Sequence, residues 1–478
     1  MSRCSACDHS CKVVLGDGPE PCEALFIGEK PGREEASRGY PFCGDTGKEF
    51  NQNYLHLAGL ERETIRITST VKCRLGDNND KPTDKQIQAC AGHWLKKEVE
   101  RSEPEFIVVM GATACKVLGD GVVDLDKDHG LPMWFEGSDL LPWKGWVWPM
   151  YHPALGMHDT SKMYPLMEDF TRLGKWRRGK FQHKVDDGSR DYKLIERVDE
   201  LDEDMRDESY DYLPTDTEDD SRGRIWSVQY SIRPGHGRMF LVENKEMVEA
   251  WALNARWGRQ GLALHNGPHD LRKLREVGVD GFKWIDTMQE AYHLCDLPQG
   301  LKSIGWRVFG VRMRDYVDVV EGWSRKAAQA WLARVWMYES ERPDVKVEQY
   351  KKPIKRKGVL VSEKRVEKPN EWCKSAKWVL DHSGSATYDV WNKIVEVKLN
   401  GRYDFLEGED GGGVIGPAPR KGIELVPIEE AVRYGCEDAD VTGRVMLWMR
   451  AERKRRVAEG GRWWVDQRDW DACRVVER

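Results

Sequence analysis

The chain contains no long apolar run. No stretch of about 18 uncharged apolar residues, the length that a membrane-spanning helix needs, occurs among its 478 residues. The first residues, Met-Ser-Arg-Cys-Ser-Ala-Cys, lack the apolar segment of a secretory signal peptide. A phosphate-binding loop with its lysine, a dinucleotide-binding glycine pattern and an internal repeat are also missing. These absences argue against a membrane protein and a common nucleotide-binding fold, and we expect a cytoplasmic protein.

The composition is typical of a soluble protein with real apolar cores. Apolar residues make up 40% of the chain, charged residues make up 33%, and the net charge is −6. This length gives room for two or three domains. Twelve cysteines in a long chain without a secretory signal favour thiols or metal ligands over a disulfide framework. The acidic balance does not argue against nucleic acid, because local charge decides that binding.

An Asp-x-Glu motif ends a strand-like segment, Tyr-Leu-Pro-Thr-Asp-Thr-Glu, at residues 212–218. Residues two apart on a strand point to the same side, so Asp216 and Glu218 can converge. Two close carboxylates repel each other unless a cation lies between them, and oxygen ligands suit Mg²⁺ or Mn²⁺. An ordinary acidic surface is the alternative, because Asp219 and Asp220 continue the run.

Two later segments supply matching groups. An apolar strand at residues 262–264 leads into a turn that delivers Asp270, and a helical pattern over residues 428–449 carries Tyr434 and Asp438 on one face. Together with the first motif they make four carboxylates and one tyrosine. Cleavage of a phosphodiester by two metal ions requires such carboxylates, and a tyrosine hydroxyl can orient the attacking water.

In order and spacing these residues resemble the 3′–5′ exonuclease domain of DNA polymerase I and its phage relatives, over roughly residues 190–450. The three motifs of that family, Asp-x-Glu, Asn-x-x-x-Asp and Tyr-x-x-x-Asp, all occur here, and the middle one begins at Asn266. The resemblance implies an RNase H-like domain with a mixed sheet that hydrolyses single-stranded DNA from its 3′ end. It also implies two Mg²⁺ or Mn²⁺ ions, held by Asp216, Glu218, Asp270 and Asp438.

The first half carries a cysteine pair and a glycine-rich turn. Cys4 and Cys7 form a Cys-x-x-Cys clip, which needs two more thiolates; Cys73 and Cys90 are candidates, and two reduced cysteines are the alternative. A buried-strand pattern at residues 24–27 ends in Gly-Glu-Lys-Pro-Gly, where glycines let the backbone approach a ligand closely. Further strands are predicted at residues 65–71, 106–110 and 146–150. Strands that alternate with helices indicate a parallel sheet covered on both faces.

Over roughly residues 1–175 these features resemble the iron–sulfur uracil-DNA glycosylases known as family 4. The resemblance implies an α/β/α domain and a structural [4Fe–4S] cluster, held by Cys4, Cys7, Cys73 and Cys90. In such a site the base leaves the stack and is stacked on an aromatic ring.

The resemblance also assigns roles to individual side chains. Phe42 is the stacking platform, Glu29 and Glu35 position or polarise water near the sugar, and His152 stabilises charge on the departing uracil or holds a flanking phosphate. Two positions depart from the family. Ser69 replaces an asparagine that reads the uracil edge, and Lys30 stands where a small residue is usual. A domain that binds DNA without cutting the glycosidic bond is therefore the alternative.

The chain is thus expected to be a two-domain α/β protein. We predict a glycosylase-like domain at residues 1–180, a linker at 181–190, and an exonuclease domain at 191–478 with a long insertion at about 311–420. A basic stretch, Lys351 to Lys368, is either a solvated loop or a strip that contacts DNA phosphates. Because little chain follows the last motif, we expect a separate polymerase subunit as partner. A free-standing repair or nucleotide-scavenging enzyme is the other possibility.

Overall fold

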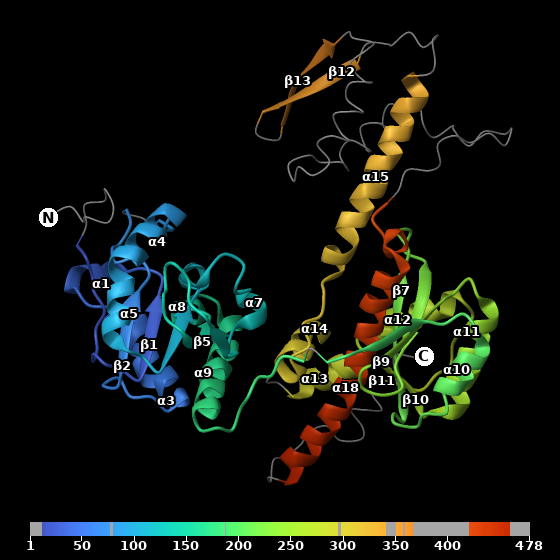
Figure 1. Ribbon diagram of the computed structural model, residues 1–478, viewed down its shortest axis with the longest axis horizontal. Helices are drawn as coiled ribbons and strands as arrows, with labels where there is room; N and C mark the ends of the chain where they lie inside the picture. Colours follow the sequence, from blue (N-terminus) through green and yellow to red (C-terminus); the bar gives the residue numbers. More distant parts are fainter. Residues whose placement is uncertain are drawn as a thin grey trace. The chain divides into compact units, whose positions relative to one another are not determined.

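The computed structural model describes residues 12–76, 80–186, 188–294, 298–340, 350–356, 359–366 and 420–458. The chain divides into two units, drawn in Figure 1. The first contains Met1–Asp187 with Leu294–Pro298 and Ser303–Arg312, and the second contains Gly188–His293, Gln299–Lys302 and Met313–Arg478. The main segment of the first unit therefore ends at Asp187. The return of two short later segments to the first unit was not expected from the sequence.

The first unit is built on a five-stranded sheet in the order β2-β1-β3-β5-β4. Its strands are β1 (Ala24–Gly28), β2 (Ile65–Ser69), β3 (Phe106–Met110), β4 (Met133–Phe135) and β5 (Gly145–Met150). The first four strands in that order run parallel, as the sequence pattern predicted, and only the edge strand β4 is antiparallel to its neighbour. The carboxyl ends of β1, β2, β3 and β5 consequently lie along the same edge of the sheet.

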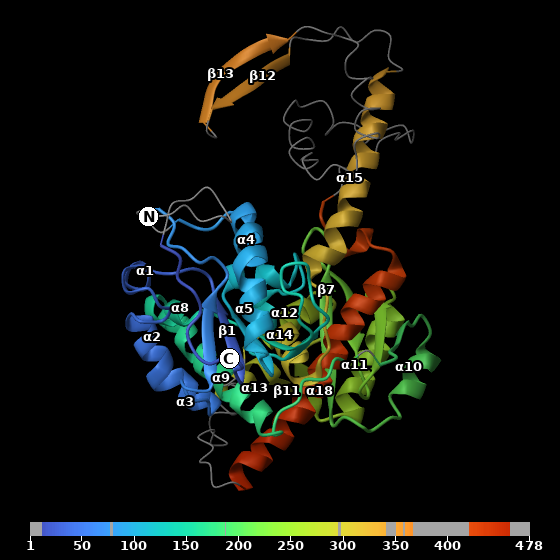
Figure 2. The ribbon, with the colours of Figure 1, turned by 60° about the vertical axis from the view of Figure 1, so that its left-hand side comes forward.

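Helices cover both faces of this sheet, as Figure 2 shows around β1. They are α1 (Arg33–Arg38), α2 (Asp45–Glu49), α3 (Leu55–Ala58), α4 (Asp84–Cys90), α5 (Lys96–Ser102), α6 (Ala112–Cys115), α7 (Leu125–Asp128), α8 (Pro153–His158) and α9 (Met163–Arg177). Side chains alternate between the faces along β1, as the period of a strand dictates. Phe26 packs with Leu173 of α9 on one face, whereas Leu25 and Ile27 pack with Val99 of α5 on the other.

The second unit contains a six-stranded mixed sheet in the order β11-β10-β7-β8-β9-β6. Its strands are β6 (Asp191–Leu194), β7 (Tyr212–Asp219), β8 (Ile225–Tyr230), β9 (His236–Leu241), β10 (Gly261–Leu264) and β11 (Trp284–Asp286). The central strands β7, β8 and β9 are antiparallel, and β10, β11 and β6 join them in parallel. Strand β7, with the Asp-x-Glu motif, is thus an inner strand, and its neighbours fix its direction.

Helices also flank this second sheet. They are α10 (Val198–Asp204), α11 (Lys245–Gly258), α12 (Gly267–Glu276), α13 (Thr287–Leu294), α14 (Leu301–Ile304), α15 (Tyr316–Ser340) and α18 (Ile428–Ala458). Side chains of α10, α11 and α12 pack on one face with Leu213, Val228 and Phe240 of the strands. The other face is covered by α18, which is red in Figure 1. The helix is longer than the predicted pattern, which ended at residue 449.

Two glycines let α18 pack close to the sheet. A Cβ atom on Gly443 would lie 2.7 Å from the Tyr210 ring and 2.8 Å from Pro214, and one on Gly435 would lie 2.9 Å from Gln229. Such distances leave no room for a side chain. The sequence therefore sets a short helix-to-sheet distance at the place where the third motif faces β7.

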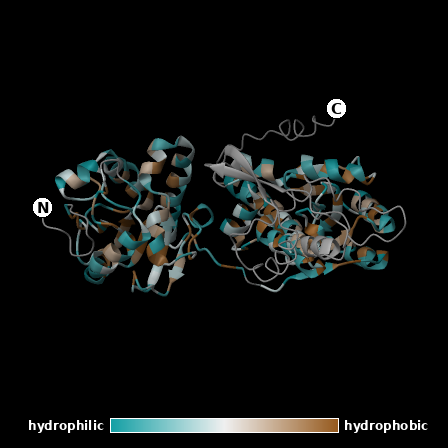
Figure 3. Cartoon of the chain, turned by 90° about the horizontal axis from the view of Figure 1, so that it is seen from above, coloured by the Kyte–Doolittle hydropathy of each residue, from teal (hydrophilic) through white to brown (hydrophobic). Residues whose placement is uncertain are grey.

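Apolar residues, brown in Figure 3, follow the strands, and the helices carry both brown and teal. No helix among the described residues is long and apolar enough to cross a membrane. Much of the predicted insertion lies outside the described residues. Within the basic stretch, the structure gives only the backbone of a two-stranded antiparallel ladder, β12 (Tyr350–Arg356) with β13 (Val359–Val366).

Candidate functional site

Two groups of predicted site residues come together, one in each unit. In the first unit they gather where the parallel strands end. A Cβ atom on Gly28, the last residue of β1, would lie 3.4 Å from Nε2 of His152 and 3.7 Å from the ring of Phe42. Ser69 ends β2 directly beside Gly28. The sheet edge therefore brings together side chains that are up to 124 positions apart in the sequence.

Phe42 stands in a loop whose conformation is set by Glu35. Its φ of 55° lies in the left-handed region, which non-glycine residues rarely adopt. The Phe42 ring lies 5.0 Å from that of Phe50 and 5.7 Å from that of His152, between centroids. Glu35 accepts the backbone N–H of Phe42 with one oxygen and that of Gly32, at 2.5 Å, with the other. In this structure Glu35 thus fixes the conformation of the loop that carries Phe42.

Glu29 and Lys30 form an ion pair at the end of β1. The hydroxyl of Thr113, just after β3, donates to the other oxygen of Glu29 at 2.7 Å. Burial alone would raise the pKa of Glu29, but the bonds from Lys30 and Thr113 hold it below its usual value. The carboxylate is therefore ionised at neutral pH. Lys30, whose side chain is only 8% exposed, neutralises this charge locally.

His152 caps the start of α8. Its Nδ1 accepts the backbone N–H of Ala154 at 3.2 Å, so the ring proton lies on Nε2, the nitrogen that faces Gly28. Burial lowers the pKa of His152 to about 4, against the opposing effect of the Glu29 charge. The residue is thus a neutral hydrogen-bond donor at physiological pH. The short side chain of Ser69 is buried at the same edge.

Cys73 and Cys90 lie together at one end of the first unit. Both are buried, and Sγ of Cys90 accepts the backbone N–H of Lys72, the residue before Cys73, at 3.2 Å. Val71, Leu75 and Ile87 surround Cys90 with apolar contacts. Cys73 takes part in a disulfide bond in this structure. Once reduced, two buried cysteines beside a backbone donor would be a suitable partial ligand set for an iron–sulfur cluster. The other two expected ligands, Cys4 and Cys7, lie outside the described residues.

A buried ion pair that sequence reasoning missed supports the segment between Ser69 and the two cysteines. Lys72 pairs with Glu98 of α5, and their side chains are 0% and 1% exposed. Glu98 also accepts the hydroxyl of Thr68 at 2.5 Å and the backbone N–H of Gly16 at 2.7 Å. Burial is the largest effect on the pKa of Lys72 and lowers it. The partners are 26 positions apart, so no local pattern announces the pair.

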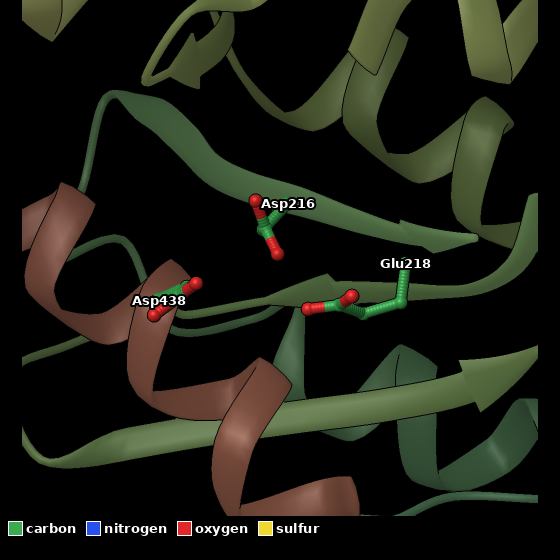
Figure 4. A group of neighbouring side chains, drawn as sticks. All are labelled: Asp216, Glu218 and Asp438. Carbon is green, nitrogen blue, oxygen red and sulfur yellow. The ribbon is translucent and has the colours of Figure 1, made fainter. Parts of the chain in front are cut away.

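In the second unit three predicted carboxylates meet. Asp216 and Glu218 come from β7 and Asp438 comes from α18, and their oxygen atoms lie within 4.8 Å of one another. Figure 4 shows the three groups facing the same space between strand and helix. The alternation of a strand places the first two on one side, and the close packing of α18 brings the third to them. The alternative of an acidic surface run does not describe this arrangement, because Glu218 is buried and Asp216 and Asp438 are half-buried.

Asp270 contacts the opposite face of β7 and is not among the three carboxylates whose oxygen atoms lie within 4.8 Å of one another. It lies within α12, not in a turn as expected, and accepts the hydroxyl of Thr217 at 2.7 Å. Thr217 points away from its neighbours in the motif because adjacent strand residues face opposite sides. Asp286 fixes the start of α12 by accepting the backbone N–H groups of Asn266 at 3.1 Å and Gly267 at 3.0 Å.

The four carboxylates have raised pKa values, which a nearby cation offsets only in part. Burial, followed by repulsion from the other acids, raises the pKa of Asp216 and of Glu218 well above the usual value. Burial also raises the pKa of Asp270 and of Asp438 to about 7. Lys302 opposes the effect on Glu218 and Asp438, without cancelling it. Carboxylate oxygen atoms with raised pKa values of this kind suit a divalent cation.

Tyr434 lies one turn before Asp438 and is buried. Nζ of Lys302 lies 3.4 Å from its hydroxyl and 4.8 Å from the centre of its ring. The ring of Tyr316 packs against it at 6.1 Å. Sequence reasoning did not propose Lys302 as a site residue.

Asp440 anchors this stretch of α18. Its side chain is fully buried and accepts the hydroxyl of Tyr192 and the backbone N–H of Gly235, both at 2.8 Å. Arg444, one turn later, donates to both of its oxygens, at 3.1 and 3.0 Å. Asp440 is therefore a structural acid that ties the helix to β6 and β9.

Comparison with known proteins concerns the first unit. The family model described as the uracil DNA glycosylase superfamily matches residues 15–172. The type-4 uracil-DNA glycosylase of Thermotoga maritima is 34% identical over 166 residues, which are 34% of this chain and 81% of the relative. That of Archaeoglobus fulgidus is 33% identical over 180 residues, 37% of this chain and 88% of the relative. The type-4 uracil-DNA glycosylase of Sulfurisphaera tokodaii is 30% identical over 177 residues, which are 36% of this chain and 77% of the relative. Through its N-terminal third, the chain belongs to the uracil-DNA glycosylase superfamily.

Proposed function

We propose that the first unit excises uracil from DNA, in keeping with the repair role that its family supports. The observation that carries this proposal is the convergence of His152, Phe42 and Glu29 at the end of β1. The Phe42 ring would stack on the extruded base. The Nε2–H of His152 would donate to the base as negative charge develops on it, and the ionised Glu29 would stabilise positive charge on the sugar and orient water.

The two unusual residues bear on the base that is selected. Ser69 offers one hydroxyl in place of an amide, which costs about 1–3 kcal/mol for each base edge atom left unpaired. Lys30 is committed to Glu29 and is largely buried, so it does not reach out to a phosphate. A domain that binds uracil-containing DNA without cutting it is the competing function.

We also propose that Cys73 and Cys90, with Cys4 and Cys7, hold a structural [4Fe–4S] cluster.

Excision can be measured apart from any nuclease by incubating a uracil-containing duplex in EDTA. We expect abasic product from the wild type and a loss of roughly 100- to 1,000-fold in rate for His152→Ala, the usual effect of removing one such donor. His56→Gln, an exposed histidine on α3, is the control and should keep the wild-type rate. Tight binding without abasic product would contradict excision and favour the binding function.

We further propose that the second unit is a metal-dependent 3′–5′ exonuclease. The meeting of Asp216, Glu218 and Asp438, with Asp270 beside them, carries this proposal. These four residues would hold two Mg²⁺ or Mn²⁺ ions, which when bound stabilise the attacking and leaving oxygens of phosphodiester cleavage. Tyr434, held by Lys302, would orient the attacking water.

A 5′-labelled single strand incubated with Mg²⁺ tests the exonuclease. We expect stepwise shortening by the wild type and a fall on the order of 1,000-fold for Asp216→Asn, because one metal ligand is worth several kcal/mol. Asp199→Asn, an exposed acid on α10, is the matched control and should remain active. Equal rates for the two variants would contradict the assignment.

We also propose that a separate polymerase subunit is the partner of this chain. If the two proteins do not co-elute at micromolar concentration, that proposal is contradicted.

A further inference from the structure

A cavity lies in the first unit, apart from the residues gathered at the end of β1. Its volume is about 490 Å³, and its wall includes Tyr151, Lys162, Asp169, Arg172 and Arg307. Tyr151 precedes His152 in the chain, but it contacts a different set of residues, among them His129, whose ring centre lies 4.4 Å away. A volume of this size holds a small molecule of several rings and is larger than a single inorganic anion needs.

Arg307 is the unusual member of this wall. It is 6% exposed, and its Nη2 atom has no hydrogen-bond partner. Among the residues that the structure describes, no carboxylate lies within 4.0 Å of its guanidinium. Burial is the main effect on its pKa and lowers it to about 10, so the group is still charged at neutral pH. An unpaired buried cation costs several kcal/mol unless an anion accompanies it.

The acidic residues of the wall have other partners. Asp169 binds Nδ1 of His129 at 2.7 Å and lies 3.8 Å from Arg172. Asp126 accepts the hydroxyl of Tyr151 at 2.7 Å. Neither carboxylate pairs with Arg307, so the cavity keeps a cationic corner even though acids line it too.

Lys162 adds a second cation at the wall. Its Nζ lies 3.4 Å from the hydroxyl of Tyr151 and 4.7 Å from the centre of that ring. It has no carboxylate partner among the described residues. Glu168 also lines the wall, one residue before Asp169. The cavity therefore combines cationic groups with acceptors, which suits a ligand that carries both negative charge and hydrogen-bond donors.

We propose that this cavity binds a nucleoside monophosphate, with the phosphate at Arg307 and Lys162. Arginine pairs with phosphate oxygens through two parallel hydrogen bonds, so an available guanidinium is well suited to this group. The Oδ1 atom of Asp169 is buried without a hydrogen-bond partner, and a sugar hydroxyl or a base N–H could donate to it. The proposal depends on neither catalytic site, because no residue of those sites belongs to the wall.

The test is calorimetric titration of the full chain with thymidine monophosphate in EDTA, which keeps metal ions from the carboxylate site. We expect one saturable site, and binding of thymidine, which lacks the phosphate, at least roughly tenfold weaker. Arg307→Gln should weaken the nucleotide at least tenfold. Arg312→Gln, from the same segment but with a 54% exposed side chain, should bind like the wild type. If Arg307→Gln does not fold, Lys162→Gln should show the same loss.

Three outcomes would overturn the proposal. The first is no saturable binding by the wild type at millimolar nucleotide. The second is equal affinity for inorganic phosphate and for thymidine monophosphate, because the cavity would then bind a simple anion. The third is displacement of the nucleotide by oligothymidylate in the wild type but not in Arg307→Gln. The cavity would then bind the DNA backbone.

Discussion

The contact between α18 and the sheet makes a sharp prediction for Gly443→Ala. The new Cβ atom would lie 2.7 Å from Cζ of Tyr210 and 2.8 Å from Cγ of Pro214. Carbon atoms in contact prefer about 3.5–4.0 Å, so helix and sheet must separate locally by roughly 1 Å. The Tyr210 side chain is 1% exposed and cannot swing into solvent, and the proline ring is rigid. Asp438, five residues earlier on α18, would shift with the helix.

The expected magnitudes differ for stability and for function. Overpacking costs about 1–3 kcal/mol, while replacing a helical glycine by alanine returns about 1 kcal/mol, so a net loss of about 0–2 kcal/mol is expected. A displacement of roughly 1 Å at a reacting centre can reduce the rate by on the order of 100-fold. Gly443→Ala should therefore lose much of the proposed exonuclease activity while remaining folded.

The assay compares Gly443→Ala with Gly322→Ala on α15, where a Cβ atom would meet nothing within 4 Å. Thermal unfolding, Mn²⁺ binding by calorimetry and shortening of a labelled strand are measured for both proteins. Gly322→Ala should be neutral or slightly stabilising and fully active. The reasoning is refuted if Gly443→Ala binds metal and shortens DNA as well as Gly322→Ala does.

Three further predictions concern the first unit. Lys72→Met should lower the free energy of unfolding of the first unit by about 3–5 kcal/mol, because Glu98 is left buried without its cation. Urea denaturation measures this, and a change below about 1 kcal/mol would contradict the role of the ion pair. The pKa of His152 is about 4 in the folded chain instead of 6.5, so the unfolded chain takes up a proton more readily. The free energy of unfolding should therefore fall as the pH drops from about 6.5 towards 4. An NMR titration of the folded protein that gives His152 a pKa of 6.5 would contradict this. Cys90→Ser should reduce the iron content and visible absorbance of purified protein, and unchanged iron would exclude this thiol as a cluster ligand.

Local sequence patterns predicted the elements that hold both sites. Apolar runs located β1, β3 and β5, and the 3.6-residue period located most of α18. The meeting of Asp216 with Glu218 follows from the alternation of a strand, and the pairing of Tyr434 with Asp438 on one helix face follows from the helical period. Such features depend on neighbours in the chain, so a single sequence reveals them.

Features that depend on distant partners were not predicted. The bond from Thr217 to Asp270 joins β7 to α12, and Lys302 approaches Tyr434 across 132 positions. The resemblance implied that Glu35 positions water near the sugar; that both of its oxygens also accept backbone N–H groups of its own loop could not be predicted. Hydrogen bonds of this kind leave no periodic trace, because only the folded chain brings the partners together.

The central claim is that two chemically separate sites share this chain. One measurement tests it: a 5′-labelled single strand with one internal uracil, incubated with Mg²⁺ and the wild type, His152→Ala or Asp438→Asn. We expect abasic product without shortening for Asp438→Asn, shortening without abasic product for His152→Ala, and both for the wild type. Loss of both activities in either variant, with folding intact, would contradict two independent sites.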